Sequence, residues 1–309
     1  MRIVTSVDSL ETIQNPILTI GTFDGVHIGH QKIIHQINEI AKQVNGSSTL
    51  FTFRPHPRMV LNPTGHGVQL IQSQEEKQHK LARLGLDTMI VFPFTKSFSQ
   101  LTATEFVEEY LVKKIGVKTV VIGYDHQFGK NREGTLELLE TLAPKHGFDV
   151  IEISAEDIND VNVSSTKIRK ALIDGDIHTA NTFLGSPFQL TGTVIKGAQI
   201  GRSINYPTAN LKLSEPHKLI PKQGVYAITT TYNDKLYKGM LNIGTKPTVS
   251  SKSELSLEVH LLDFSEDLYH QTIQLDLLHY LREETAFDSL EALKNQLIQD
   301  EATTRHLLY

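Results

Sequence analysis

The chain has 309 residues, enough for about two domains of ordinary size, each with its own core. Thirty Lys and Arg against 35 Asp and Glu give a formal net charge of −5, so the broad basic face of a general nucleic-acid-binding protein is missing. The absence of cysteine excludes disulfides, thiolate nucleophiles and Cys-ligated metal sites. The N-terminal residues lack the apolar core of a signal peptide, and no long apolar run occurs, so we expect a cytoplasmic protein without a membrane segment.

The first half of the chain alternates short apolar β-rich runs with helical patterns. Such alternation is typical of a parallel α/β sheet with helices on both faces, and predicts a Rossmann-like, doubly wound domain over residues 1–185. Thr102 with Glu105 resembles a capping box, and Gly85 and Gly116 stand where helices should end. The expected strands are 17–21, 49–53, 88–92, 119–123 and 149–153, and the expected helices lie near 29–45, 74–84, 103–114, 134–146 and 165–183.

The pattern changes after Gly185-Ser186-Pro187. Strand-like runs now follow one another without helices between them, which predicts a small antiparallel β-barrel over residues 186–309. A hairpin turn is expected at 232–235, and Asp288 with Glu291 is expected to cap a final helix over 289–307. The expected strands of this half are 188–195, 224–232, 235–244, 255–264 and 272–281.

A glycine- and histidine-rich run, GTFDGVHIGH at 21–30, follows the strand expected at 17–21 and opens the next helix. In a parallel sheet this position is where ligands gather. Its glycines allow backbone N–H groups to approach a phosphate, and His27 and His30 can donate to the same oxygens. An isolated histidine pair more often only supports the fold, but this location favours a site that stabilises negative charge. The Gly129-Lys130 pair lacks a following Ser or Thr, which disfavours a P-loop kinase.

Three further runs accompany this HxGH motif in the first half of the chain: FTFRPHP at 51–57, GYDHQFG at 123–129 and VSSTKIR at 163–169. The third supplies hydroxyl and cationic donors to a phosphate, and the aromatic ring of Phe128 can stack on a ligand. Each has an ordinary alternative: a rigid turn, a core phenylalanine or an N-cap serine.

Taken together, these runs resemble the FMN adenylyltransferase module of bacterial bifunctional riboflavin kinase/FAD synthetases. The resemblance implies that His27 and His30 hold the ATP triphosphate and stabilise the transition state. His126 stands where the family usually has a second phenylalanine. By the same resemblance, Asp125 and Phe128 contact the flavin, and the ATP-binding residues are Gly21, Phe23, Gly25, Gly29, Ser165, Thr166 and Arg169.

The second half carries a separate polar constellation, in which GTVIKGAQIGR at 192–202 precedes NYPTANL at 205–211. Gly197 permits close approach of a phosphate and Arg202 offers charge. The Thr208 hydroxyl and the Asn210 amide oxygen are hard ligands suited to Mg²⁺. The alternative is a glycine-rich bend followed by an ordinary turn.

Downstream runs at 239–248, 258–264 and 280–284 make this half resemble the riboflavin kinase module of the same enzymes. The resemblance implies that Glu258 is the general base, that Thr208 and Asn210 contact Mg²⁺-ATP, and that Arg282 belongs to a flavin-closing loop. Strand alternation places Glu258 on the face opposite its apolar neighbours. The ordinary alternatives are a solvated glutamate for Glu258 and a surface ion pair for Arg282.

The combined resemblance implies a bifunctional enzyme of flavin cofactor biosynthesis. It would phosphorylate riboflavin to FMN and adenylylate FMN to FAD, using Mg²⁺ and ATP, with pyrophosphate released in the second reaction. Two other functions stay open: a nucleotidyltransferase for another small phosphate, and a regulator that binds flavin or nucleotide without catalysis. No basic-aromatic pattern supports a nucleic-acid partner. The sequence does not predict the oligomeric state.

Overall fold

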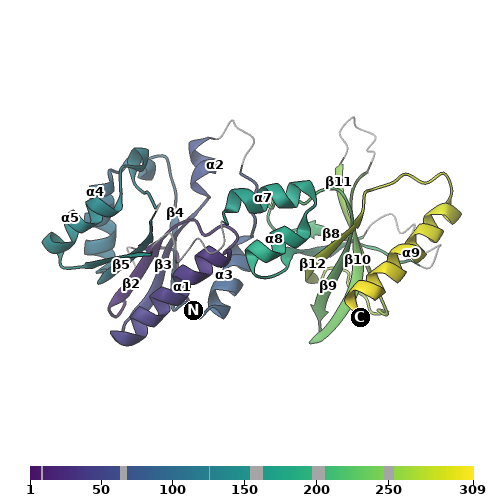
Figure 1. Cartoon of the computed structure of the whole chain (residues 1–309), viewed down its shortest axis with the longest axis horizontal. Helices are drawn as coiled ribbons and strands as arrows, with labels where there is room; N and C mark the ends of the chain where they lie inside the picture. Colours follow the sequence, from purple (N-terminus) through teal and green to yellow (C-terminus); the bar gives the residue numbers. More distant parts are fainter. Residues whose placement is uncertain (8–9, 63–67, 125, 154–162, 197–205, 247–253) are drawn as a thin grey trace. The chain divides into compact units, whose positions relative to one another are not determined.

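The computed structural model describes the chain except for residues 8–9, 63–67, 125, 154–162, 197–205 and 247–253. Two compact units divide the chain between them (Figure 1). The first contains Met1–Gln69 and Lys77–Ser164, and the second contains Leu70–Glu76 and Ser165–Tyr309. No helix among the described residues is both long and apolar enough to cross a membrane.

The first unit is built on a parallel sheet whose strand order is β1-β4-β3-β2-β5-β6. This order confirms the predicted doubly wound α/β fold. A three-residue strand, β1, was not predicted because it is too short to show an alternating pattern. The strands are β1 (Arg2–Val4), β2 (Pro16–Ile20), β3 (Ser47–Arg54), β4 (Thr88–Pro93), β5 (Thr119–Gly123) and β6 (Asp149–Ile153).

Helices pack against both faces of this sheet, because successive strand residues point to opposite sides. On β2, Ile17 packs with residues of α1 and α3, whereas Leu18 packs with residues of α4, η2 and α5. The predicted Thr102–Glu105 capping box is present at the start of α4. The helical elements are α1 (Ile28–Gln43), α2 (Pro57–Leu61), α3 (Gln74–Arg83), η1 (Phe98–Gln100), α4 (Ala103–Phe106), the π-helical η2 (Val107–Ile115), η3 (Lys130–Arg132) and α5 (Leu136–His146).

The second unit is a closed antiparallel barrel of strand order β10-β11-β8-β7-β12-β9 with a C-terminal helix, which confirms the predicted β-barrel. Strand β8 was not among the predicted strands, because its run was interpreted as part of a phosphate loop with polar Mg²⁺ ligands. The elements of the second unit are α7 (Ser165–Asp174), α8 (Ile177–Leu184), β7 (Phe188–Ile195), β8 (Ala209–Leu213), β9 (Gly224–Tyr232), β10 (Lys235–Lys246), β11 (Glu254–Leu261), β12 (Thr272–Arg282) and α9 (Leu290–Leu308).

Two local predictions in this unit were wrong. The single helix expected over 165–183 is two helices, because Gly175 adopts a left-handed φ of +84° and Asp176 then caps α8 by accepting from the Thr179 amide. The cap of α9 is Ser289, whose hydroxyl accepts from the Ala292 amide, and not Asp288. Both errors concern helix ends, where a shift of one residue changes the capping group.

A buried ion pair ties the segment Leu70–Glu76 to the barrel within the second unit. The side chains of Glu76 and Lys218 are each 2% exposed and are hydrogen-bonded to one another. Glu76 also accepts from the Thr191 hydroxyl at 2.9 Å, and Lys218 donates to the Ile71 carbonyl at 2.7 Å. Both charges are therefore compensated by neighbours, which a buried pair requires to be tolerated.

Removing one partner of this pair should be costly. We expect Lys218→Met to lower the free energy of unfolding by about 3 kcal/mol, since it leaves the Glu76 carboxylate buried without its counter-charge. The double variant Glu76→Gln with Lys218→Met should recover most of that loss. Urea unfolding followed by circular dichroism measures both, and a single variant as stable as the parent chain would contradict the assignment.

Candidate active sites

The glycine-rich turn between β2 and α1 has the tight geometry that its sequence predicts. A Cβ on Gly21 would lie 2.9 Å from the Phe23 ring, so only glycine allows this ring to fold over the turn. Gly25 has a φ of +95°, and Phe23 and Val26 are also left-handed, at φ 48° and 39°. Non-glycine residues rarely adopt this conformation, and such strain is concentrated at functional sites.

The two histidines of the turn are stacked at the start of α1. Their ring centroids are 3.7 Å apart, and the Phe23 ring stacks on the other side of His30 at 4.4 Å. His27 is the N-cap of α1, and its Nδ1 accepts from the His30 amide at 3.3 Å. In the neutral ring the proton of His27 is therefore on Nε2, which remains a donor. His30 Nδ1 is buried without a hydrogen-bond partner among the described residues, which is uncommon for a buried polar atom and is consistent with a ligand-binding position.

Burial and nearby cations keep both imidazoles neutral. Burial, followed by the charge of Lys80, lowers the pKa of His27 from 6.5 to about 4. Burial also lowers the pKa of His30 well below its usual value, with smaller contributions from His27, Lys77 and Lys80. At neutral pH both rings therefore carry an N–H donor and no formal charge.

The remaining predicted residues of the first constellation are distributed as follows. Gly29 is buried in the first turn of α1. Ser165, Thr166 and Arg169 lie in the first turns of α7, which belongs to the second compact unit; Thr166 is exposed and the other two are half-buried. Phe128 packs in the core against Phe106, with centroids 5.8 Å apart, as the alternative interpretation expected. Asp125, Gly197 and Arg202 lie outside the described residues.

The barrel aligns three polar residues in one row across neighbouring strands. Glu258 on β11 stands opposite Asn210 on β8 and opposite Asn242 on β10. Directly opposed residues of antiparallel strands project to the same face, so these three side chains are neighbours. Ser256 donates to the Glu258 carboxylate at 3.1 Å. Thr208 precedes β8 directly, so the structure brings the predicted ligands and the predicted base together.

Alternation on β11 follows the expectation for Glu258. Leu257 and Val259 are 4% and 2% exposed, whereas Glu258 is only half-buried on the opposite face. Sequence reasoning missed Asn242, although it lies in one of the runs that carried the resemblance. Its signal was available only through the register of β10 against β11, which the sequence alone does not fix.

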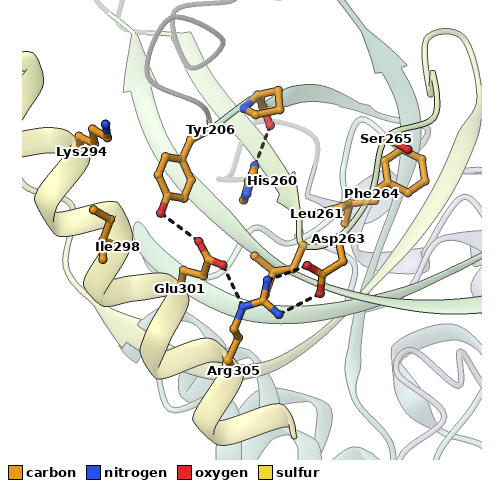
Figure 2. A pocket seen from close by; sticks show the side chains of 12 residues that line it. Tyr206, His260, Leu261, Asp263, Phe264, Ser265, Lys294, Ile298, Glu301 and Arg305 are labelled. Atoms are coloured by element: carbon orange, nitrogen blue, oxygen red, sulfur yellow. Dashed lines mark hydrogen bonds and ion pairs between the residues drawn. The ribbon is translucent and has the colours of Figure 1, made fainter.

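Helix α9 borders an open groove of about 600 Å³ beside the barrel (Figure 2). Within the groove, the Tyr206 hydroxyl donates to Glu301 at 2.9 Å, and Glu301 accepts from Arg305 at 2.8 Å. Arg305 also makes a two-pronged contact with Asp263, with both distances 2.9 Å. Burial, reinforced by Glu301, raises the pKa of Tyr206 to about 12, so its hydroxyl stays a donor.

Two further contacts lie near this groove. The His260 Nδ1 atom is 2.8 Å from the Pro207 carbonyl oxygen, next to the predicted ligand Thr208 (Figure 2). Arg282, the predicted flavin-loop residue, is held by the buried Asp300 of α9 through contacts of 2.8 to 3.0 Å. The ion-pair alternative for Arg282 is therefore what the structure contains, and a flavin would have to meet the guanidinium in that arrangement.

Comparison with known proteins assigns both halves of the chain to one family of enzymes. The FAD synthetase family model matches residues 10–167, and the riboflavin kinase family model matches residues 184–308. A bifunctional riboflavin kinase/FMN adenylyltransferase from Listeria monocytogenes is 39% identical over 94% of this chain and 92% of its own. The chain belongs to this bifunctional family. The Escherichia coli K12 relative is 36% identical, over 99% of this chain and 97% of its own.

A solved structure extends the similarity to the fold. The structure named as a macrolide-efflux protein from Streptococcus pneumoniae has a TM-score of 0.88 and 31% identity, and the match covers 98% of both chains. Membership of the bifunctional family thus agrees with an α/β sheet unit and a closed barrel in one chain.

The neutral state of His27 should make this family member sensitive to acid. Its folded pKa of about 4 lies below 6.5, so the unfolded chain takes up the proton first as the pH falls. This contribution to stability is fully present above about pH 6.5 and is lost as the pH falls towards 4. The loss amounts to about 1.4 kcal/mol by about pH 5.5.

The variant His27→Asn keeps an N-cap side chain but cannot be protonated. We therefore expect it to lose about 1.4 kcal/mol less than the parent chain between about pH 7 and pH 5.5 in urea unfolding. Equal losses in both proteins would show that His27 is not held neutral.

Proposed function

We propose that the chain converts riboflavin to FMN and FMN to FAD, with one ATP consumed in each step. Residues 186–309 would carry the kinase reaction and residues 1–185 the adenylyl transfer, both in the cytoplasm. The observation that supports this most directly is the presence of two separately built polar sites: the stacked histidines on the glycine turn, and the row of Asn242, Glu258 and Asn210.

Adenylyl transfer would proceed by direct displacement at the α-phosphorus of ATP. An oxygen of the FMN phosphate forms the new P–O bond while the bond to pyrophosphate breaks, and no covalent enzyme intermediate is needed. The N–H groups of His27 and His30 would donate to the phosphate oxygens as charge develops on them. The glycine turn, with Gly21, Phe23, Gly25 and Gly29, would bind the ATP, as would Ser165, Thr166 and Arg169, and Asp125 and Phe128 would contact the flavin. Arg282 would instead belong to a flavin-closing loop of the kinase reaction in the barrel.

In the barrel, Glu258 would accept the proton of the ribityl 5′-hydroxyl while that oxygen bonds to the γ-phosphorus of ATP, the bond from the γ-phosphorus to ADP breaks, and ADP leaves. The Thr208 hydroxyl and Asn210 amide oxygen fit a hard cation, and bound Mg²⁺ would neutralise phosphate charge. Gly197 and Arg202 would contact those phosphates.

The test is product analysis with the purified chain. It is incubated with Mg²⁺ and ATP, first with riboflavin and then separately with FMN, and flavins are resolved by chromatography over time. FMN followed by FAD supports both assignments. FAD formed only from FMN would leave the barrel as a binding module, and no product under oxidising or reducing conditions would overturn the proposal in favour of a non-catalytic regulator.

A further inference from the structure

We propose that two lysines of α3 complete the adenylyl-transfer site: Lys80 binds the ATP triphosphate, and Lys77 is a positioning residue that fixes the glycine turn. This inference rests on the proposed adenylyl transfer. Neither residue belongs to the motifs that indicated the site, and both lie in the first compact unit with the histidines.

Lys77 is fixed beneath the turn. Its ammonium donates to the Thr22 carbonyl at 3.1 Å and to the Thr52 hydroxyl at 3.4 Å, and the Thr52 hydroxyl itself donates to the Thr22 carbonyl at 3.2 Å. Thr22 precedes Phe23, whose ring stacks on His30. The Lys77 side chain, which is only 7% exposed, thus links α3 and Thr52 of β3 to Thr22, the residue directly before Phe23.

Burial of the Lys77 ammonium costs free energy of desolvation, which its hydrogen bonds and a nearby carboxylate must offset. Desolvation lowers the pKa of Lys77 to about 8, opposed by the negative charge of the buried Asp24. A buried ammonium is tolerated where hydrogen bonds and an opposite charge compensate it. The hydrogen bond from Lys77 to the Thr22 carbonyl therefore helps to hold the glycine turn in its strained, left-handed conformation.

Lys80 follows Lys77 by one helical turn, so both lie on the same face of α3. Lys80 is half-buried, and its charge contributes to the lowered pKa of both His27 and His30, so its ammonium lies within electrostatic range of the pair. Since the imidazoles are neutral, the α3 lysines supply formal positive charge beside them. A partly desolvated ammonium interacts with a polyanion more strongly than one in bulk water does.

The two roles predict different kinetic effects. Lys80→Met should raise the KM for ATP in FAD formation about tenfold or more, because a charged hydrogen bond to phosphate is lost. Lys80→Arg should restore most of that affinity. Lys77→Met should instead lower kcat about tenfold or more with little change in KM. Without Lys77 the glycine turn shifts, and the His27 and His30 N–H groups no longer align with the transition state.

Riboflavin phosphorylation in the barrel should stay at the parent rate in each variant, which controls for the second compact unit, and urea unfolding followed by circular dichroism controls for folding of the first. Lys42→Met is the matched surface control: Lys42 is 72% exposed on α1, where it pairs with Glu39, and its removal should change neither reaction. If the parent chain forms no FAD from FMN, the proposed function fails, whereas normal FAD formation by Lys80→Met with an unchanged KM overturns only this inference.

A pH series separates binding by Lys80 from a purely structural role. Burial lowers the pKa of Lys80 to about 8, so the ammonium loses its proton above that pH. In the parent chain the KM for ATP should rise as the pH passes about 8, and in Lys80→Arg this rise should be absent, since arginine stays charged. The same rise in both proteins would contradict phosphate binding by Lys80.

Discussion

Replacement of His30 by alanine should slow FAD formation from FMN about 10²- to 10³-fold and leave riboflavin phosphorylation unchanged. The His30 ring lies between His27 and Phe23, and its Nδ1 atom is buried with no partner in the described part of the chain. A donor held in this way needs no reorganisation when negative charge develops on a phosphate. Alanine would remove that donor and also the ring on which both neighbours stack.

Steady-state rates of both reactions in one preparation measure this effect. His35→Ala is a suitable control, because His35 is an exposed residue on the same helix and its removal should leave both rates near the parent values. A folded His30→Ala protein that has lost both activities would contradict two independent sites. A protein that retains full FAD formation would show that His30 is only structural.

Most of the architecture could be predicted from the sequence, because most of its longer helices and strands have a local signal, whereas the short strands β1 and β8 have none that identified them. The buried strand 119–123 and the strand 149–153 coincide with the residues predicted, since their apolar-rich runs end at clear breaks. The break at Gly175 was missed because helical periodicity continues on both sides of it, and only its left-handed backbone separates α7 from α8. Local pattern thus fixes the existence of an element better than it fixes its ends.

The candidate sites were predictable to the extent that they are continuous in sequence. The glycine turn and its histidines form one run, so their spacing together with their place between a strand and a helix indicated a phosphate site. Lys77 and Lys80 were missed because a helix with two lysines is ordinary, and only the packing of α3 brings the Lys77 ammonium to Thr22. Asn242 was missed for the same reason, since its place beside Glu258 depends on strand register.

Replacement of Glu258 by glutamine should have the opposite effect to the His30 change. Glutamine keeps the size of the side chain but cannot accept the proton of the ribityl hydroxyl, so riboflavin phosphorylation should fall about 10²- to 10⁴-fold. FAD formation should stay at the parent rate when FMN is supplied. The geometric support is the register that places Glu258 between Asn210 and Asn242, on the face away from the buried Leu257 and Val259.

Ser256→Ala distinguishes the base from its surroundings. Ser256 donates one hydrogen bond to the Glu258 carboxylate at 3.1 Å and so helps to hold its orientation. Its loss should leave the maximal rate of riboflavin phosphorylation within about tenfold of the parent rate, because the base itself remains. If Glu258→Gln phosphorylates riboflavin as fast as the parent chain, proton transfer to Glu258 is not part of the reaction, and the row of Asn242, Glu258 and Asn210 serves only to bind substrate.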